Sequence, residues 1–270
     1  MDAPVHTSID GAIARITLNR PDKRNALDRA TLAALTTTLQ RCERDNAVRV
    51  IELRAAGEVF CAGADLGEMQ SQRDASEAAN LADAARLATL LGLLDGVGKP
   101  TLARVQGDGY GGALGLMAAC DVVVAASHAR FAFTEVRLGI IPAVISPFVL
   151  AKIGASAARR YFLTAERLDA ARLRELGLIH EVVAGAELDA ACARLTRALL
   201  EAAPGALAEA KRLIRDVTAA AAGRGPVERA ATAAEMGKRL ASLRVQPEAR
   251  EGFAAFFEKR KPQWAAKPQD

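Results

Sequence analysis

Two glycine-rich segments carry residue types that allow backbone N–H groups to approach a ligand closely. They are residues 60–66 (FCAGADL) and 106–113 (QGDGYGGA), and each follows an expected β-strand, at 48–53 and 101–106. Small residues at a strand-to-helix turn admit a ligand, and free N–H groups at a helix start stabilise an anion. Two such loops on neighbouring strands could direct two N–H groups at one carbonyl oxygen, as an oxyanion hole requires. The alternative is that the glycines serve only tight turns and close helix packing.

Glu135 is the carboxylate best placed for proton transfer. It lies in residues 130–139 (RFAFTEVRLG), an apolar run that we expect to be largely buried. Burial raises the pKa of a carboxyl group toward neutrality, which suits an acid or base catalyst. The alternative is a structural ion pair between Glu135 and Arg137 or Arg130.

Other kinds of site are disfavoured. His6, His128 and His180 are scattered, so we expect structural or surface roles for them and no metal site. The four cysteines contain no CxxC pair, which disfavours zinc and disulfides and favours reduced thiols in a cytoplasmic protein. The third glycine of a GxGxxG motif would fall on Leu114, and no GxxxxGK[ST] motif is present, so a dinucleotide is disfavoured.

The composition is that of a globular protein. The chain has 270 residues, of which 51% are hydrophobic and 25% charged. Its net charge of +4 permits an anionic small-molecule ligand but does not argue for a nucleic acid. The most apolar region, residues 116–126, is interrupted by Asp121 and is far shorter than the ~20 residues of a membrane span. Residues 1–4 lack the pattern of a secretory signal.

Hydrophobic periodicity predicts the elements that position these segments. The first part alternates strands and helices, with a hairpin at 5–9 and 13–18, a helix capped by Asp28, a helix at 75–94, and strands at 48–53, 101–106 and 122–126. After Gly139 the pattern is mostly helical, with a short helix from Asp169 to Gly177, a strand at 179–183, and helices at 188–201, 204–216, 227–243 and 247–258. We therefore expect an α/β core over residues 1–200 and a helical region over 201–270.

Five segments, in order along essentially the whole chain, resemble the motifs of the crotonase (enoyl-CoA hydratase/isomerase) family. Residues 19–27 (NRPDKRNAL) resemble NRPxxxNAL, residues 60–66 resemble FxAGAD, and residues 106–121 resemble QGxxxGGG…CD. Residues 134–142 (TEVRLGIIP) resemble PExxxGxxP, and residues 163–178 resemble LTG…A…GLV. One such motif is weak evidence, whereas five in the right order are strong evidence.

The resemblance implies a fold, a substrate class and a set of site residues. The fold would be a spiral of ββα units with a helical C-terminal region that makes a homotrimer or a dimer of trimers. The substrate would be an acyl-CoA thioester, so coenzyme A would be part of the substrate and no separate cofactor is expected. Ala64 and Gly112 would supply the two oxyanion N–H groups, with Glu135 as the acid or base. The residues along the CoA would be Arg24, Ala62, Asp65, Leu66 and, from the closing helix, Lys259.

One departure from the family pattern bears on the reaction. The earlier of two glutamates in the best-known hydratases falls on Gly115, and no Asp or Glu lies between Asp108 and Asp121. Glu135 would therefore act alone. A second departure is the segment 143–147 (AVISP), where the family commonly has a glycine-rich helix start. Both departures are similar to hydratases of branched glutaconyl-CoA thioesters, as in leucine or acyclic terpene breakdown, and Gly115 would leave room for a branched acyl tail.

Three functions are compatible with the sequence. The first is hydration of a branched 2-enoyl-CoA, and the second is a double-bond isomerase with Glu135 as its only proton shuttle. The third is RNA binding, as in some methylglutaconyl-CoA hydratase relatives that use a lysine-rich helix. The corresponding helix at 28–45 has three arginines but no lysine, and it also carries Glu43 and Asp45. RNA binding is therefore disfavoured.

Overall fold

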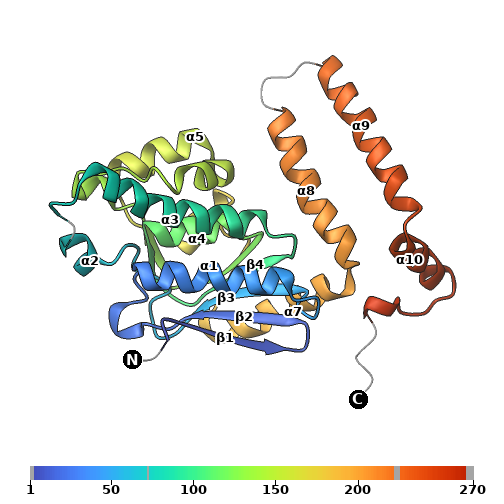
Figure 1. Ribbon diagram of the computed structural model, residues 1–270, viewed down its shortest axis with the longest axis horizontal. Helices are drawn as coiled ribbons and strands as arrows, with labels where there is room; N and C mark the ends of the chain where they lie inside the picture. The colour runs from blue at the N-terminus through green and yellow to red at the C-terminus, as the bar shows by residue number, and fades with distance from the viewer. Residues whose placement is uncertain (1–2, 72, 222–225, 266–270) are drawn as a thin grey trace. The chain divides into compact units, whose positions relative to one another are not determined.

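The computed structural model describes residues 3–71, 73–221 and 226–265, and the chain divides into two compact units (Figure 1). The first unit comprises Met1–Val97 and Thr101–Thr196, and the second comprises Gly98–Pro100 and Arg197–Asp270. The first unit is an α/β structure, as expected. Among the described residues, no helix combines the length and apolar character needed to cross a membrane.

A six-stranded sheet forms the frame of the first unit. Its order is β1-β2-β3-β4-β6-β9, in which β1 and β2 are antiparallel and every other neighbouring pair is parallel. The predicted hairpin is confirmed. The strands are β1 (Val5–Asp10), β2 (Ile13–Leu18), β3 (Val50–Ala55), β4 (Thr101–Val105), β6 (Val122–Ala126) and β9 (Glu181–Val183).

A second sheet, which the sequence analysis did not predict, joins the segments that carry the site. It has the order β5-β7-β8, with strands β5 (Gly109–Tyr110), β7 (Arg130–Ala132) and β8 (Leu168–Asp169). Gly109 pairs with Phe131 and Tyr110 with Ala132, so the second glycine-rich loop lies beside the chain that leads to Glu135.

The helices of the first unit pack mainly against one face of the large sheet (Figure 1). Asp28 caps α1 (Arg29–Arg44) by accepting the Thr31 N–H at 2.7 Å, and Leu32, Leu35 and Leu39 face the core as their spacing predicts. The other helices are α2 (Leu66–Ser71), α3 (Glu77–Gly96), α4 (Gly112–Ala119), α5 (Ser146–Thr164) and α6 (Ala170–Glu175). Because strand residues alternate between faces, Ala103 and Val123 join this core while Leu102 and Val124 face the other side.

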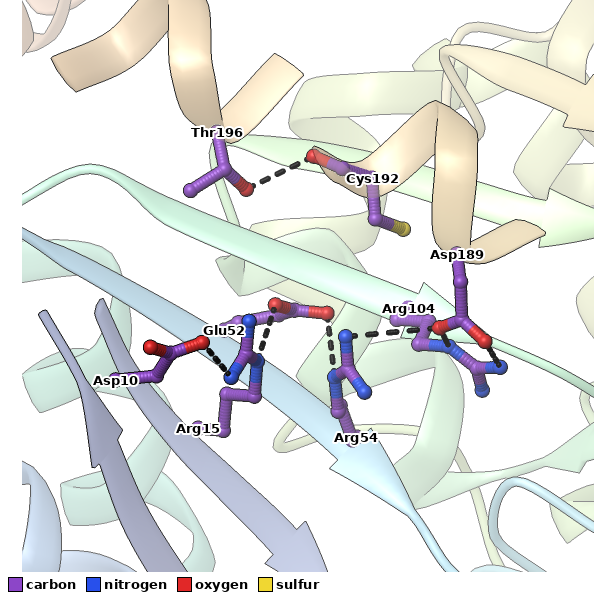
Figure 2. Close-up of polar contacts among 8 residues, drawn as sticks. All are labelled: Asp10, Arg15, Glu52, Arg54, Arg104, Asp189, Cys192 and Thr196. Atoms are coloured by element: carbon purple, nitrogen blue, oxygen red, sulfur yellow. Dashed lines mark hydrogen bonds and ion pairs between the residues drawn. The ribbon is translucent and has the colours of Figure 1, made fainter. Parts of the chain in front are cut away.

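Helix α7 (Leu188–Glu201) covers that other face and is tied to it by a ladder of charges (Figure 2). Glu52 is only 2% exposed and forms ion pairs with Arg54 at 2.5 Å and Arg15 at 3.6 Å. Asp189, in the first turn of α7, accepts two hydrogen bonds from Arg104 at 2.7 and 3.2 Å. The buried carboxylate of Glu52 is thus paired with arginine side chains, as a low-dielectric environment requires.

The second unit is helical, as expected for this part of the chain. Its helices are α8 (Pro204–Ala221), α9 (Pro226–Arg244) and α10 (Pro247–Phe257). Arg239 of α9 forms ion pairs with Glu209 and Asp216 of α8, both at 2.7 Å. The Glu248 carboxylate accepts the Gly205 and Ala206 N–H groups, which joins α10 to the start of α8.

Candidate active site

A cavity of about 240 Å³ lies in the first unit where both glycine-rich loops meet the segment that carries Glu135. Most of its wall is aliphatic. It is lined by residues of the two loops (Ala62, Gly63, Ala64, Gly111 and Gly112), by Leu27 and Leu32, by Leu66, Glu68 and Met69 of α2, by Asp83, Ala84 and Leu87 of α3, and by Thr134, Glu135, Leu138 and residues 140–145. The three segments that the sequence analysis selected are therefore brought together.

The first loop holds the Ala64 N–H in a defined direction. The Leu27 N–H donates a hydrogen bond to the Gly63 carbonyl oxygen at 2.7 Å. In a planar trans peptide the carbonyl and the following N–H point in opposite directions. Because the Gly63 carbonyl points toward Leu27, the Ala64 N–H points away from Leu27, within the same peptide plane.

The second loop fixes the Gly112 N–H in the same way. The Leu114 N–H donates to the Gly111 carbonyl oxygen at 3.0 Å, which sets the plane of the Gly111–Gly112 peptide. Gly111 has φ +50° and precedes the first residue of α4, so the Gly112 N–H belongs to a helix N-terminus. Such N–H groups lack intrahelical acceptors and favour negative charge.

The two loops are in direct contact. The Tyr110 N–H donates to the Cys61 carbonyl oxygen at 3.0 Å. Gly63 has φ +86°, and a Cβ atom added there would lie 2.7 Å from the Tyr110 carbonyl oxygen. Only glycine fits this approach, so the glycine at position 63 serves the juxtaposition of the two loops.

Glu135 is half-buried rather than largely buried and lies against the second loop, and its carboxylate forms no ion pair with a described residue. It begins a short 3₁₀ helix (Glu135–Leu138), and a Cβ atom added to Gly111 would lie 3.1 Å from its Oε1. Its Oε2 is buried and has no hydrogen-bond partner among the described residues. Burial raises the pKa of Glu135 above its ordinary value, while a hydrogen bond from its own backbone N–H opposes the rise.

The alternative ion pair of Glu135 with Arg130 or Arg137 is wrong. Arg130 Nη1 donates to the carbonyl oxygens of Ser127, His128 and Ala129. Arg137 Nη2 donates to the Ala165 carbonyl oxygen at 2.8 Å. Both guanidinium groups are engaged by backbone carbonyls, which leaves the carboxylate available for chemistry.

Gly115 does not open the cavity as expected. It is buried in α4, and a Cβ atom added there would lie 2.4 Å from Ile145 Cγ2 and 3.2 Å from Leu91 Cδ1. Ile145, from the second departing segment, therefore occupies the space that a side chain at position 115 would need. The expectation that Gly115 leaves room for a branched acyl tail is wrong, because that room is filled by Ile145.

A second, more open hollow of about 620 Å³ adjoins the first loop. The four residues of the first unit expected along the CoA all line it: Arg24, Ala62, Asp65 and Leu66. Lys23, Tyr110 and Arg137 line it as well, although no motif of the sequence pointed to them. Its lining has three cationic side chains (Lys23, Arg24 and Arg137) and two carboxylates (Asp22 and Asp65), and this excess of positive charge suits an anionic ligand.

Asp65 anchors the start of α2 rather than standing free in that hollow. It accepts hydrogen bonds from the Gly67 N–H at 2.9 Å and from Arg20 Nη2 at 3.0 Å. Burial alone would raise its pKa, but these bonds and one from the Glu68 N–H hold the pKa below its ordinary value. Lys259, the fifth residue expected along the CoA, lies in the second unit and is exposed, so its role stays a prediction.

Two further carboxylates line the cavity without having been predicted. Glu68 and Asp83 both form ion pairs with Arg29, at 3.1 and 3.0 Å. Nothing in the local sequence distinguishes them from ordinary helix-surface charges. Because they are ion-paired, they differ from Glu135, whose Oε2 has no partner in the described part of the chain.

The arrangement can perform one kind of chemistry well. Two directed backbone N–H groups can stabilise negative charge on a carbonyl oxygen, and an unpaired carboxylate beside them can exchange a proton with the neighbouring carbon. No three His, Cys, Asp or Glu side chains of the described residues are grouped so that they could hold a metal ion.

Comparisons with known proteins agree over nearly the whole chain. The family model for enoyl-CoA hydratase/isomerase matches residues 8–267. The crystal structure of an enoyl-CoA hydratase from Shewanella pealeana is 41% identical, with a TM-score of 0.91, over 97% of this chain and 96% of that one. The mitochondrial enoyl-CoA hydratase domain-containing protein 2 of Mus musculus is 33% identical over 97% of this chain and 87% of that protein.

A third relative is covered only in part. The enoyl-CoA hydratase ACTT6 of Alternaria alternata is 37% identical over 74% of this chain, and the match spans 66% of its length, just under two thirds. The family model nevertheless extends across both units, and the fold agrees with that of a solved enoyl-CoA hydratase. The chain therefore belongs to the enoyl-CoA hydratase/isomerase, or crotonase, family.

Proposed function

We propose that this protein adds water across the 2,3 double bond of an enoyl-CoA thioester. The observation that carries the proposal is the buried, unpartnered Oε2 of Glu135, beside the loop that presents the Gly112 N–H. A buried carboxylate oxygen without a hydrogen-bond partner is costly to the fold, and such groups cluster at functional sites. The relatives named as enoyl-CoA hydratases support the same reaction.

The reaction divides between one carboxylate and two amides. The ionised Glu135 takes a proton from water as the water oxygen bonds to C3 of the substrate. The electron pair of the double bond moves toward the thioester carbonyl, and the resulting enolate oxygen accepts hydrogen bonds from the Ala64 and Gly112 N–H groups. Glu135 then returns its proton to C2, which completes the addition of one water molecule and restores the carboxylate.

The acyl chain and the CoA moiety of the substrate would bind in the two cavities. The acyl chain would occupy the aliphatic cavity, and the CoA moiety would occupy the hollow lined by Arg24, Ala62, Asp65 and Leu66. Lys259 at the CoA phosphates, the assembly into a homotrimer or dimer of trimers, and a cytoplasmic role in fatty-acid or leucine breakdown stay predictions.

The test is turnover of crotonyl-CoA by the full chain, followed as loss of the conjugated-thioester absorbance. We expect absorbance loss and, in heavy-oxygen water, incorporation of solvent oxygen at C3. If no 2-enoyl-CoA of any chain length is hydrated, the proposal fails.

A second candidate, enoyl-CoA double-bond isomerisation, rests on the absence of a second unpaired carboxylate from the described cavity wall. Glu135 alone could move a proton from C2 to C4 of a 3-enoyl-CoA through the same stabilised enolate. An isomerase would raise the conjugated-thioester absorbance from a 3-enoyl-CoA and would incorporate no solvent oxygen. That outcome, without hydration of 2-enoyl-CoA, would replace the first proposal by the second.

The finer expectation of a branched glutaconyl thioester needs its own test. Such a substrate carries a second carboxylate, whereas the charged residues lining the described cavity are Glu68, Asp83 and Glu135, all acidic. A dicarboxylic substrate would therefore need a cation from outside this wall. Comparing 3-methylcrotonyl-CoA with 3-methylglutaconyl-CoA isolates the contribution of that carboxylate. A preference for 3-methylglutaconyl-CoA would support the glutaconyl hypothesis and would require a cation from outside the cavity wall.

A further inference from the structure

Cys61 is a buried thiol that the reaction does not use directly. It lies in the first glycine-rich loop, three residues before Ala64, and is 0% exposed. Burial raises its pKa to about 12, with a hydrogen bond from the Gly63 N–H opposing the rise, so the group remains a neutral thiol. It is therefore neither a nucleophile nor an acid at neutral pH.

The sulfur nevertheless makes a defined contact with the backbone of the loop. The Gly63 N–H donates to Cys61 Sγ at 3.4 Å, a side-chain-to-backbone bond two residues along the chain. The same kind of local bond from Asn, Asp or Ser stabilises turns. Gly63 needs such support because its φ of +86° and its contact with Tyr110 place it in a tight turn.

The peptide groups on both sides of Gly63 are thus held separately. The N–H of the Ala62–Gly63 peptide is held by Cys61 Sγ, and the carbonyl of the Gly63–Ala64 peptide is held by the Leu27 N–H. The second peptide contains the Ala64 N–H. The two peptides share the Cα of Gly63, so a rotation of the first peptide would be passed on to the second and would turn the Ala64 N–H.

We propose that Cys61 is a positioning residue for the oxyanion-binding Ala64 N–H, acting through its hydrogen bond with the Gly63 N–H. The inference rests on the proposed function, since it assumes that the Ala64 N–H binds the enolate oxygen. Sulfur is a weak acceptor, so the contribution corresponds to a rate factor of about three to ten rather than hundreds. A serine at this position has a hydroxyl that can accept the same N–H.

The experiment compares Cys61→Ala, Cys61→Ser and a matched control in the full chain. The control is Cys192→Ala, which removes the same atoms from a place that is also 0% exposed but lies on the far face of the large sheet. We expect Cys61→Ala to lower kcat for crotonyl-CoA hydration about three- to tenfold with KM changed less than about twofold. Cys61→Ser and Cys192→Ala should keep kcat within about twofold of the wild type.

A second readout separates this inference from the proposed reaction. Acetoacetyl-CoA forms an enolate that absorbs in the near ultraviolet, and an oxyanion hole lowers its apparent pKa when it is bound. We expect Cys61→Ala to raise the apparent pKa of bound acetoacetyl-CoA relative to the wild type, and Cys61→Ser to restore it. This measurement remains valid if the protein turns over no 2-enoyl-CoA, in which case the proposed reaction fails and the positioning role survives.

Two results would overturn the inference. The first is a folded Cys61→Ala variant with wild-type kcat and an unchanged apparent pKa of bound acetoacetyl-CoA. The second is an equal loss of kcat in Cys61→Ala and Cys61→Ser, because a role that depends only on filling the space of the sulfur would not be restored by a hydroxyl group.

Discussion

Replacing Glu135 by glutamine should lower activity and raise stability at the same time. The amide keeps the size of the side chain but can neither take a proton from water nor return one to C2. We expect kcat for hydration to fall by about 10²–10⁴, the usual contribution of a general acid–base group. The same change removes an ionised carboxylate whose Oε2 is buried without a partner.

The expected gain in stability follows from that burial. Leaving a buried polar group unsatisfied costs about 1–3 kcal/mol, and more when the group is charged. Glutamine still buries a polar atom there, so the gain is the difference between a charged and a neutral group, on the order of 1 kcal/mol. For a unit of this size that corresponds to a rise in Tm of about 2–4 °C.

The pH dependence has a definite sign. Burial raises the pKa of Glu135 in the folded state above the ordinary value of 4.5, so the folded protein binds this proton more tightly than the unfolded chain does. Below pH 4.5 the Glu135 carboxyl group is protonated in both the folded and the unfolded state, so the stability gain of Glu135→Gln is smallest there. The advantage of the variant should grow as pH rises through the folded-state pKa and then level off. The wild-type kcat should fall as pH drops through that same pKa, because hydration needs the ionised carboxylate.

The assay measures kcat with crotonyl-CoA and Tm by thermal unfolding, both from pH 5 to pH 8. Glu187→Gln, at an exposed carboxylate, is the control and should change neither quantity. Near-wild-type turnover in Glu135→Gln would refute the catalytic assignment. A Tm below that of the wild type at pH 8 would refute the claim that the carboxylate is unpaired in the folded protein.

Three further predictions concern the first glycine-rich loop, the ion pairs of Glu52, and the second hollow, where we propose that CoA binds. Gly63→Ala would place alanine at φ +86° and its Cβ atom against the Tyr110 carbonyl oxygen, so kcat should fall at least about tenfold. The control is Gly92→Ala, which has open space around it and should leave kcat unchanged. Glu52→Gln should lower the free energy of unfolding by up to about 3 kcal/mol, because two arginines lose a buried partner; chemical denaturation measures this, and a loss below about 0.5 kcal/mol would contradict it. Arg24→Ala should raise KM for CoA thioesters with little change in kcat, and an unchanged KM in steady-state kinetics would argue against its placement along the CoA.

Much of the large framework could be predicted from local patterns. The β1–β2 hairpin, the Asp28 cap and the helical character after residue 188 all follow from periodicity and capping within a few residues. The bounds were less predictable where a neighbour sets them. β3 begins at Val50 rather than at residue 48, because it pairs with β2 from Ile13 onward. The small sheet could not be predicted, because strands of two or three residues have no periodicity to detect.

By itself, the sequence determined the family and the α/β core and selected the segments of the candidate site, because motif order and spacing are properties of the chain. Only the tertiary structure decided whether Glu135 is paired, since that depends on where Arg130 and Arg137 direct their side chains. It also decided whether Gly115 enlarges the cavity: it does not, because the space beside it is filled by Ile145, thirty residues away along the chain. Charge pairing and cavity shape arise between distant segments, so no local pattern records them.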